Sequence, residues 1–204
     1  MTSPQLTLNG MLNVPKKKPL ATSQKTLTPT SDKTSAVVAV DDSQRLKEIR
    51  KLVEANNESS IDTDTIICHI YMESRFDANA AASGSSARGL MQLLKAPIRE
   101  LYRVEDLRKP KAQRTDEATL YRNADTFHDS AGFVNESTNI RTGTRYLEML
   151  IQRQIRNGAA EPIVEAYKKY RGRQDGIYYR KIKDCSAKLR AAPNSMQLLR
   201  DMVK

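Results

Sequence analysis

Glu73, a carboxylate at the end of an apolar segment, is the residue best suited to chemistry. It follows Ile70 by three positions and Ile66 by seven, so helical geometry places it on the face that these isoleucines bury. Burial and the negative end of the helix dipole would both raise the pKa of Glu73. A carboxyl that stays protonated near neutral pH can act as a general acid, whereas a solvated Glu at a frayed helix end would have no catalytic role.

A loop of small residues follows this carboxylate and could supply its polar neighbours. Ser83, Ser85 and Ser86 stand among alanines and glycines and offer hydroxyl groups to a carboxyl or to a sugar. Gly89 then permits a close approach of the backbone. The Leu-Met-Gln run after it combines apolar anchors with the amide of Gln92, which is suited to hydrogen-bonding a substrate.

Four stretches of the sequence resemble the motifs of one enzyme family. "ES" at 73–74 and "SGSSARGLMQ" at 83–92 are similar to the first two motifs of lytic transglycosylases of the soluble-transglycosylase type. "NIRTGTRYLEML" at 139–150 resembles the family's following helix, and "EAYKKYRG" at 165–172 resembles its third motif. The resemblance spans roughly residues 61–183 and implies a lysozyme-like helical domain that cleaves peptidoglycan glycan strands without a cofactor.

The resemblance also implies a site and a reaction. It makes Glu73 the catalytic acid and base, with these residues around it: Ser74, Ser83, Ser85, Gln92 and Tyr167. In this family the sugar's own C6 hydroxyl attacks the anomeric carbon, so a 1,6-anhydromuramyl end is the expected product. The third motif departs from the family pattern, because Lys168 stands where Asn is usual and Tyr170 where the first Gly is usual.

A hydrolytic muramidase of the goose type is the alternative enzyme. Glycosidases in general use two carboxyls, but here only Glu73 has a strong claim, because Asp77 reads as a residue that starts a turn. The acidic residues of goose-type lysozymes, in the loop and just after the Gln, are replaced by Ser86, Leu93 and Leu94. A base that could activate water is therefore missing from these positions.

Apolar residues at helical spacing predict the elements that must position this site, and no segment alternates with period two. Helices are expected from Ser43, after Asp62 to Asp64, over 88–103 with a bend at Pro97, from Ser137 to Asn139 onward, from Pro162 through Tyr167, and from Tyr178 to Leu189. The polar stretch 104–136 gives no clear order. We therefore expect an all-α, lysozyme-like domain.

Composition divides the chain into two parts. Residues 1–42 hold four of the eight prolines, seven threonines, four serines and no aromatic residue, so they cannot bury enough surface to offset chain entropy. We expect a flexible tail there, suited to docking or delivery, followed by one transglycosylase domain over 43–204.

Charge points to a polyanionic partner, because 34 Lys and Arg residues stand against 24 acids, for a net charge of +10. Residues 168–190 contain nine of these cations, and Tyr167, Tyr170, Tyr178 and Tyr179 lie next to or among them. Such a mixture could stack nucleic-acid bases, so a basic, non-catalytic binding protein is the alternative of another class. The same mixture serves sugar stacking and attraction to an anionic wall, and we expect peptidoglycan and no nucleic acid.

Cysteine and histidine usage gives little evidence of further chemistry. Cys68 and Cys185 allow one disulfide in an oxidising compartment or a pair of buried free thiols. His69 and His128 have no partner at metal-ligand spacing, so no metal site is expected. His69 precedes Glu73 by one helical turn and reads as a core histidine.

Targeting signals are not evident. No run approaches the ~18 apolar residues of a membrane span, and the N-terminus lacks the order of charge, apolar stretch and cleavage site of a signal peptide. A wall enzyme without such a leader is expected to be made in the cytoplasm and carried out by a specialised secretion system or a phage. The partners that such delivery implies are a component of the machine and an immunity protein.

Overall fold

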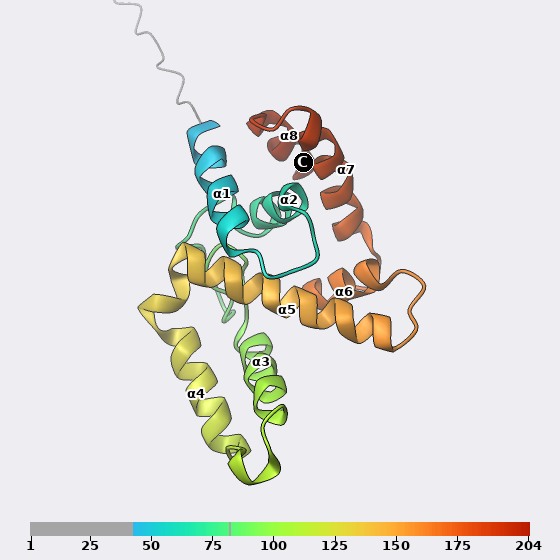
Figure 1. Ribbon diagram of the computed structural model, residues 1–204. Coiled ribbons are helices and arrows are strands. Elements are labelled where there is room, and N and C mark those ends of the chain that lie inside the picture. Colours follow the sequence, from blue (N-terminus) through green and yellow to red (C-terminus); the bar gives the residue numbers. More distant parts are fainter. Residues whose placement is uncertain (1–42, 82) are drawn as a thin grey trace, which may run out of the picture. The chain divides into compact units, whose positions relative to one another are not determined.

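The computed structural model describes residues 43–81 and 83–204, and α-helices are its main elements (Figure 1). In chain order they are α1 (Ser43–Asn56), α2 (Thr63–Ser74), α3 (Lys95–Leu107), η1 (Lys111–Gln113), α4 (Glu117–Asp129), η2 (Ala131–Val134), α5 (Glu136–Arg156), α6 (Pro162–Arg171), α7 (Ile177–Ala191) and α8 (Met196–Met202). No strand occurs among these residues, apart from isolated bridges. The all-α prediction is confirmed, while the tail predicted at 1–42 lies outside the described residues.

Helix α2 is buried by the helices that pack against it. Every residue from 65 to 71 is buried, as expected for a helix that is apolar nearly all round. Helices α1, α7 and α8 pack around it. The Asp62 side chain accepts a hydrogen bond from the Thr65 backbone N–H at 3.1 Å, so Asp62 is the N-cap among the three polar residues there. The catalytic candidate Glu73 therefore stands at the C-terminal end of a central helix.

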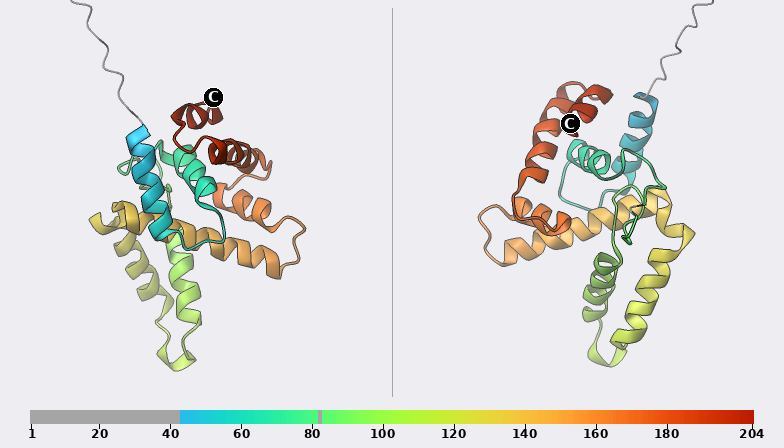
Figure 2. Two further views of the ribbon diagram at one scale, coloured as in Figure 1. Left: turned by 45° about the horizontal axis from the view of Figure 1, so that its top comes forward. Right: turned by 180° about the vertical axis from the view of Figure 1, so that it is seen from behind.

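The longest helix, α5, has 21 residues and crosses the domain between two groups of helices. Figures 1 and 2 show α3 and α4 side by side beyond one side of α5, with α1, α2, α7 and α8 on the other. Helix α6 packs along α5. The predicted apolar face of α5 is buried, at Ile140, Gly143, Leu147 and Leu150.

The expected helix over 88–103 is wrong in its first half. Residues 88–94 form a turn in which Arg88 pairs with Ala81 and Leu93, and α3 begins only at Lys95. Gly89 has φ +77° and Gln92 has φ +45°, and neither angle is compatible with an α-helix. Pro97 causes no interruption, because it lies in the first turn of α3, where a backbone donor is not needed.

The polar stretch 104–136, in which periodicity predicts no clear order, is largely helical. It completes α3 and contains η1, α4 and η2. The Asp116 side chain starts α4 by accepting from the Thr119 backbone N–H at 3.0 Å. A short C-terminal helix, α8, was not expected, and its Leu199 is fully buried.

Candidate active site around Glu73

Glu73 lines an open groove at the end of α2. The cavity has a volume of about 620 Å³. Its lining comes from the end of α2, the loop after it and the turn before α3: Met72, Glu73, Ser74, Arg75, Asp77, Asn79, Ala80, Ala81 and Gln92. The carboxyl is thus open to a ligand on one side while the rest of the side chain lies against the domain.

Tyr178, in the first turn of α7, donates a hydrogen bond from its hydroxyl to Oε1 of Glu73. Burial raises the pKa of Glu73 above its ordinary value. The Tyr178 hydrogen bond and the positive charges of Arg171 and Arg75 lower that pKa, but burial is the larger effect. The carboxyl is therefore held toward its protonated form and has donors ready to stabilise the ionised one.

Aromatic rings pack around His69, one helical turn before Glu73. The imidazole centroid lies 4.6 Å from that of Tyr170, 5.3 Å from Tyr167 and 6.0 Å from Tyr178. Burial lowers the pKa of His69 to about 3, so the ring is neutral. Within the described part of the chain its two nitrogens have no hydrogen-bond partner. It is a core histidine, as expected, but its polar atoms are not satisfied.

Residues 88–94 close the groove on the side of Gln92. The Gln92 amide nitrogen donates to the carbonyl oxygens of Ala80 at 2.7 Å and Gly89 at 2.9 Å. The fully buried Asn139 of α5 accepts from the Met91 backbone N–H at 2.8 Å. These bonds fix the turn to the loop on one side and to α5 on the other.

Tyr170 occupies the position where the family pattern expects a glycine. Its hydroxyl donates to the Met91 carbonyl oxygen at 2.8 Å, and its ring meets His69 edge-on. The Lys168 ammonium, at the usual Asn position, donates instead to Glu165 at 2.6 Å within α6. The altered motif therefore ties α6 to the turn that forms the groove wall.

The structure brings some of the predicted site residues to the groove and leaves others away from it. Ser74 and Gln92 line the groove with Glu73, although the Ser74 hydroxyl donates to the Ile70 carbonyl oxygen at 3.1 Å. Ser83 and Ser85 are exposed on the loop and do not line it. Tyr167 is 1% exposed and does not line the groove, and its hydroxyl has no partner among the described residues.

Tyr178 and Asn139 are contacts of the site that sequence reasoning did not single out. Tyr178 is 105 residues from Glu73 in the chain. The sequence places Tyr178 and Tyr179 next to each other at a helix start, and nothing in it marks which of them faces the carboxyl. The sequence marks Asn139 only as a residue that opens a helix.

Strained backbone gathers at the same place. The non-glycine residues with positive φ in the described chain are Arg75 at 56°, Phe76 at 68° and Gln92 at 45°. Arg75 and Phe76 reverse the chain directly after α2, and Gln92 stands across the groove. Such conformations persist where the surrounding contacts impose them, and they occur frequently at functional sites.

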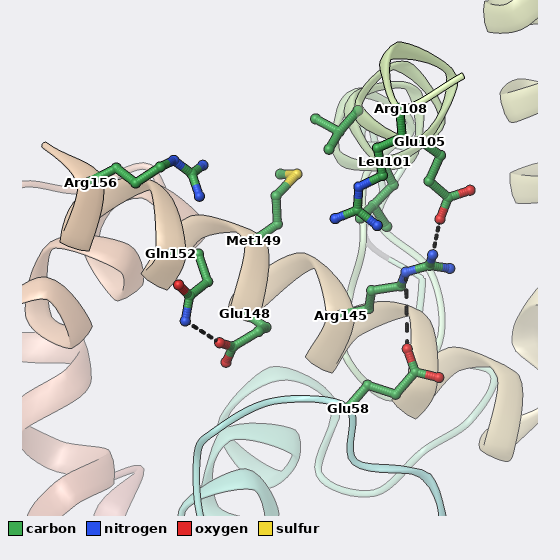
Figure 3. A pocket seen from close by; sticks show the side chains of 10 residues that line it. Glu58, Leu101, Glu105, Arg108, Arg145, Glu148, Met149, Gln152 and Arg156 are labelled. Carbon is green, nitrogen blue, oxygen red and sulfur yellow. Dashed lines mark hydrogen bonds and ion pairs between the residues drawn. The ribbon is translucent and has the colours of Figure 1, made fainter. Parts of the chain in front are cut away.

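A second hollow lies between α3 and α5 and is lined by neither Glu73 nor its partners (Figure 3). It has a volume of about 210 Å³. Figure 3 shows Arg145 between Glu58 and Glu105, and it pairs with both. Glu148 accepts from Gln152 at 2.7 Å. Because these carboxylates already have partners, this hollow is a weaker candidate for acid chemistry.

Neither a metal site nor a membrane span stands out in the structure. Among residues 43–81 and 83–204, no three His, Cys, Asp or Glu side chains gather as metal ligands would. No helix in that part of the chain has the length and apolar character to cross a bilayer.

Comparison with known proteins gives one match. A family model described as "Transglycosylase SLT domain" matches residues 52–175. No curated protein and no solved structure shows significant similarity to the chain. The matched range contains Glu73, the turn at 88–94 and the aromatic residues of α6, and it ends just before Tyr178.

Proposed function

The chain belongs to the family of transglycosylase SLT domains, and from that premise we propose that Glu73 is the acid and base with which it cleaves the β-1,4 bond between MurNAc and GlcNAc. Family membership indicates lytic transglycosylase activity on peptidoglycan in general. The observation that carries the assignment to Glu73 is its setting: a carboxyl with a raised pKa, opening on a groove and hydrogen-bonded by a partly buried tyrosine.

The proposed reaction needs a single carboxyl. Protonated Glu73 donates its proton to the glycosidic oxygen, and the resulting carboxylate then takes the proton of the sugar's own C6 hydroxyl as that oxygen attacks the anomeric carbon. The nucleophile is part of the substrate, so it gains the high effective concentration of tethered reactants. The product is a 1,6-anhydromuramyl end.

The surroundings of Glu73 suit both halves of this cycle. Burial favours the protonated acid that must begin the reaction. The Tyr178 hydroxyl and the charge of Arg171 favour the carboxylate that exists between the two proton transfers. A pKa held between these opposing effects is what a group that alternates between acid and base requires.

The supporting residues receive different roles. We propose that Gln92 shapes the groove wall, because both hydrogens of its amide are used by the carbonyls of Ala80 and Gly89. Ser74 contributes backbone and packing at the end of α2, since its hydroxyl is engaged. Ser83 and Ser85 remain candidates for hydrogen bonds to a glycan that extends over the loop. Tyr167 supports the ring cluster, because its ring packs against that of Tyr178 with centroids 6.1 Å apart.

A hydrolytic muramidase is the second candidate, and one observation favours testing it. Asp77 lines the groove with Glu73 and is exposed. Its carboxylate accepts from the Asn79 backbone N–H at 2.8 Å, which supports its interpretation as a turn residue. The hydrolytic route would need Asp77 or another base to activate water.

Nucleic-acid binding without catalysis loses support from the placement of the tyrosines. Tyr167 and Tyr179 stack on each other with centroids 4.5 Å apart, and Tyr170 and Tyr178 donate to groups of the site. Rings committed in this way are not free to stack bases.

Delivery to the wall is a separate proposal. We propose that a specialised secretion system or a phage carries the protein, with residues 1–42 as the docking segment. The support is compositional: this segment is rich in Pro, Thr and Ser and has no aromatic residue, as segments that order on a partner often are.

The direct test of the proposed function is digestion of purified sacculi by wild type and Glu73→Gln. The glutamine keeps the shape of the side chain but cannot donate the proton, so muropeptide release should fall by about 10² to 10⁴-fold. Binding to sacculi and the helical circular dichroism spectrum should be unchanged. Undiminished release by this variant would refute the role of Glu73.

A further inference from the structure

The two cysteines of the chain meet at the interface of α2 and α7. Cys68 lies on α2 and is fully buried, and Cys185 lies on α7 and is 5% exposed. The structure holds both as free thiols. Each thiol shifts the pKa of the other, as neighbouring side chains across the contact of α2 and α7 do. Two neighbouring thiols can form a disulfide by losing two hydrogens. Two distant cysteines could not.

Access to the two sulfurs differs. Cys185 lines a cavity of about 240 Å³ between α7 and α8, together with Lys181, Lys188 and Leu198. Its thiol donates to the Leu198 carbonyl oxygen at 3.5 Å. Cys68 does not line this cavity. A reagent that enters beside α8 therefore reaches Cys185 first, and Cys68 stands behind it.

The pKa values of the two thiols also favour reaction at Cys185 first. The neighbouring Cys68 lowers the pKa of Cys185, and the positive charge of Lys188 adds to this effect, although burial opposes it. The pKa of Cys68 is raised by its contact with Cys185 and by burial. Cys185 is thus the sulfur that becomes a thiolate more readily, and the thiolate is the nucleophile in disulfide exchange.

We propose that Cys185 and Cys68 are an oxidisable dithiol, in which Cys185 is the attacking thiol and Cys68 the resolving thiol. The oxidant is an organic disulfide, either a small one or that of an oxidised dithiol protein. The Cys185 thiolate attacks one sulfur of the oxidant and forms a mixed disulfide, releasing the other sulfur as a thiolate. Cys68 then loses its proton, attacks the Cys185 sulfur and releases the second thiol.

The resulting bond would join the helices that hold the site. Glu73 ends α2 and Tyr178 begins α7, so the disulfide would fix the pair of elements whose contact places the phenol on the carboxyl. A wall substrate lies in a compartment where disulfides persist, so the bond would form after delivery. The timing of oxidation rests on the proposed function, while the thiol chemistry does not.

The test is oxidation of the full chain by oxidised glutathione, followed by mass spectrometry and counting of free thiols. Wild type should lose both free thiols and two hydrogens, without retaining glutathione. Cys68→Ala should stop at the mixed disulfide and carry one glutathione on Cys185. Cys185→Ala should react far more slowly, because its remaining sulfur is buried.

A thermal measurement on wild type keeps the proposal testable even where a variant folds poorly. A disulfide that closes so long a loop should raise Tm by roughly 10 °C, and a reductant should reverse the change. Peptide mapping of partly oxidised wild type should find glutathione on Cys185 only. The proposal would be overturned if glutathione stayed on both cysteines, or if Cys68 reacted first.

Discussion

At the scale of single residues, Glu73 has to release a proton and take one back, and its neighbours favour opposite forms. Burial holds the proton on the carboxyl, while the Tyr178 hydroxyl stabilises the ionised form. The hydroxyl of Tyr167, close by in the ring cluster, has no partner in the described structure. Tyr178 and Tyr167 thus belong to the same cluster, but only Tyr178 donates a hydrogen bond to Glu73.

Replacing Tyr178 by Phe should therefore change the pH dependence of the reaction. The variant loses a hydrogen bond that favours the carboxylate, so the pKa of Glu73 rises further. The limb of the kcat/KM profile on which activity falls as the acid loses its proton should move to higher pH. A hydrogen bond to a charged group contributes about 1.5–3 kcal/mol, so kcat/KM at the optimum should fall by about 10- to 100-fold.

Tyr167→Phe is the matched control, because it removes a hydroxyl of the same cluster that makes no hydrogen bond to Glu73. Its pH profile should keep the limb of wild type. The prediction fails if this limb of the pH profile stays in place in Tyr178→Phe, or if it shifts equally in both variants. Either result would show that the Tyr178 hydrogen bond does not determine the pKa of Glu73.

At the scale of elements, the site depends on how closely α5 approaches the turn at 88–94. Gly143 of α5 faces Met91, and a Cβ on Gly143 would lie 2.4 Å from the Met91 sulfur and 2.9 Å from its Cβ. Asn139, one turn earlier, binds the Met91 backbone N–H. The same helix face therefore sets both the position and the hydrogen bonding of the groove wall.

Gly143→Ala should destabilise the domain although alanine favours a helix. The propensity gain is about 1 kcal/mol, but the clash with Met91 should cost more, so we expect a net loss of roughly 1–2 kcal/mol. Urea unfolding measures this loss, and sacculus digestion should fall with it as the turn shifts. Gly132→Ala, where the nearest atom would lie at 3.7 Å, is the tolerated control.

A double mutant separates the clash from a general effect on α5. In a Met91→Ala background the contacts of the added Cβ with the Met91 sulfur and terminal methyl are gone and only the contact with the Cβ of residue 91 remains, so the second substitution should cost less than in wild type. An equal cost in both backgrounds would mean that the approach of α5 to Met91 does not matter.

The sequence predicts those elements whose residues repeat at helical spacing over a full face. The buried stripes of α2 and α5 were found for that reason, and the all-α class with them. The sequence predicts a helix in place of the turn at 88–94, because the apolar residues of the turn fill the core as those of a helix would. Its geometry comes from the positive φ of Gly89 and Gln92 and from the Asn139 side chain, which is 48 residues from Met91 in the chain.

For the site, too, the sequence predicts what depends on spacing within one helix and not what depends on packing between elements. The spacing of Glu73 after Ile70 places it against the core, and the structure has it half-buried at the end of α2. The Tyr178 contact depends on how α7 packs on α2, and periodicity within one helix carries no information about that. Ser83 and Ser85 lie in a loop whose course no local pattern determines.

At the scale of the whole molecule, charge and compartment decide where the enzyme acts. Eight of the nine cations at 168–190 are exposed, and a net charge of +10 attracts an anionic wall at long range. The proposed substrate lies outside the cytoplasm. The protein should then be harmless where it is made and damaging where the wall is.

Expression in two compartments of a bacterial host tests this. With a fused signal peptide that exports the chain, wild type should lyse the cells and Glu73→Gln should not, which growth curves and release of a cytoplasmic marker would measure. Cytoplasmic expression of wild type should leave growth normal. Equal toxicity from both compartments would count against a wall substrate and would favour a nucleic-acid partner.

The most direct test of the central claim is the chemistry of the released ends. Sacculi are digested in water enriched in heavy oxygen, and the muropeptides are analysed by mass spectrometry before and after borohydride reduction. A single acid and base at Glu73 predicts 1,6-anhydromuramyl ends that resist reduction and carry no oxygen from the solvent, and none of them from Glu73→Gln. Reducible ends that carry heavy oxygen would contradict the account, because they would mean that water, activated by another base, is the nucleophile.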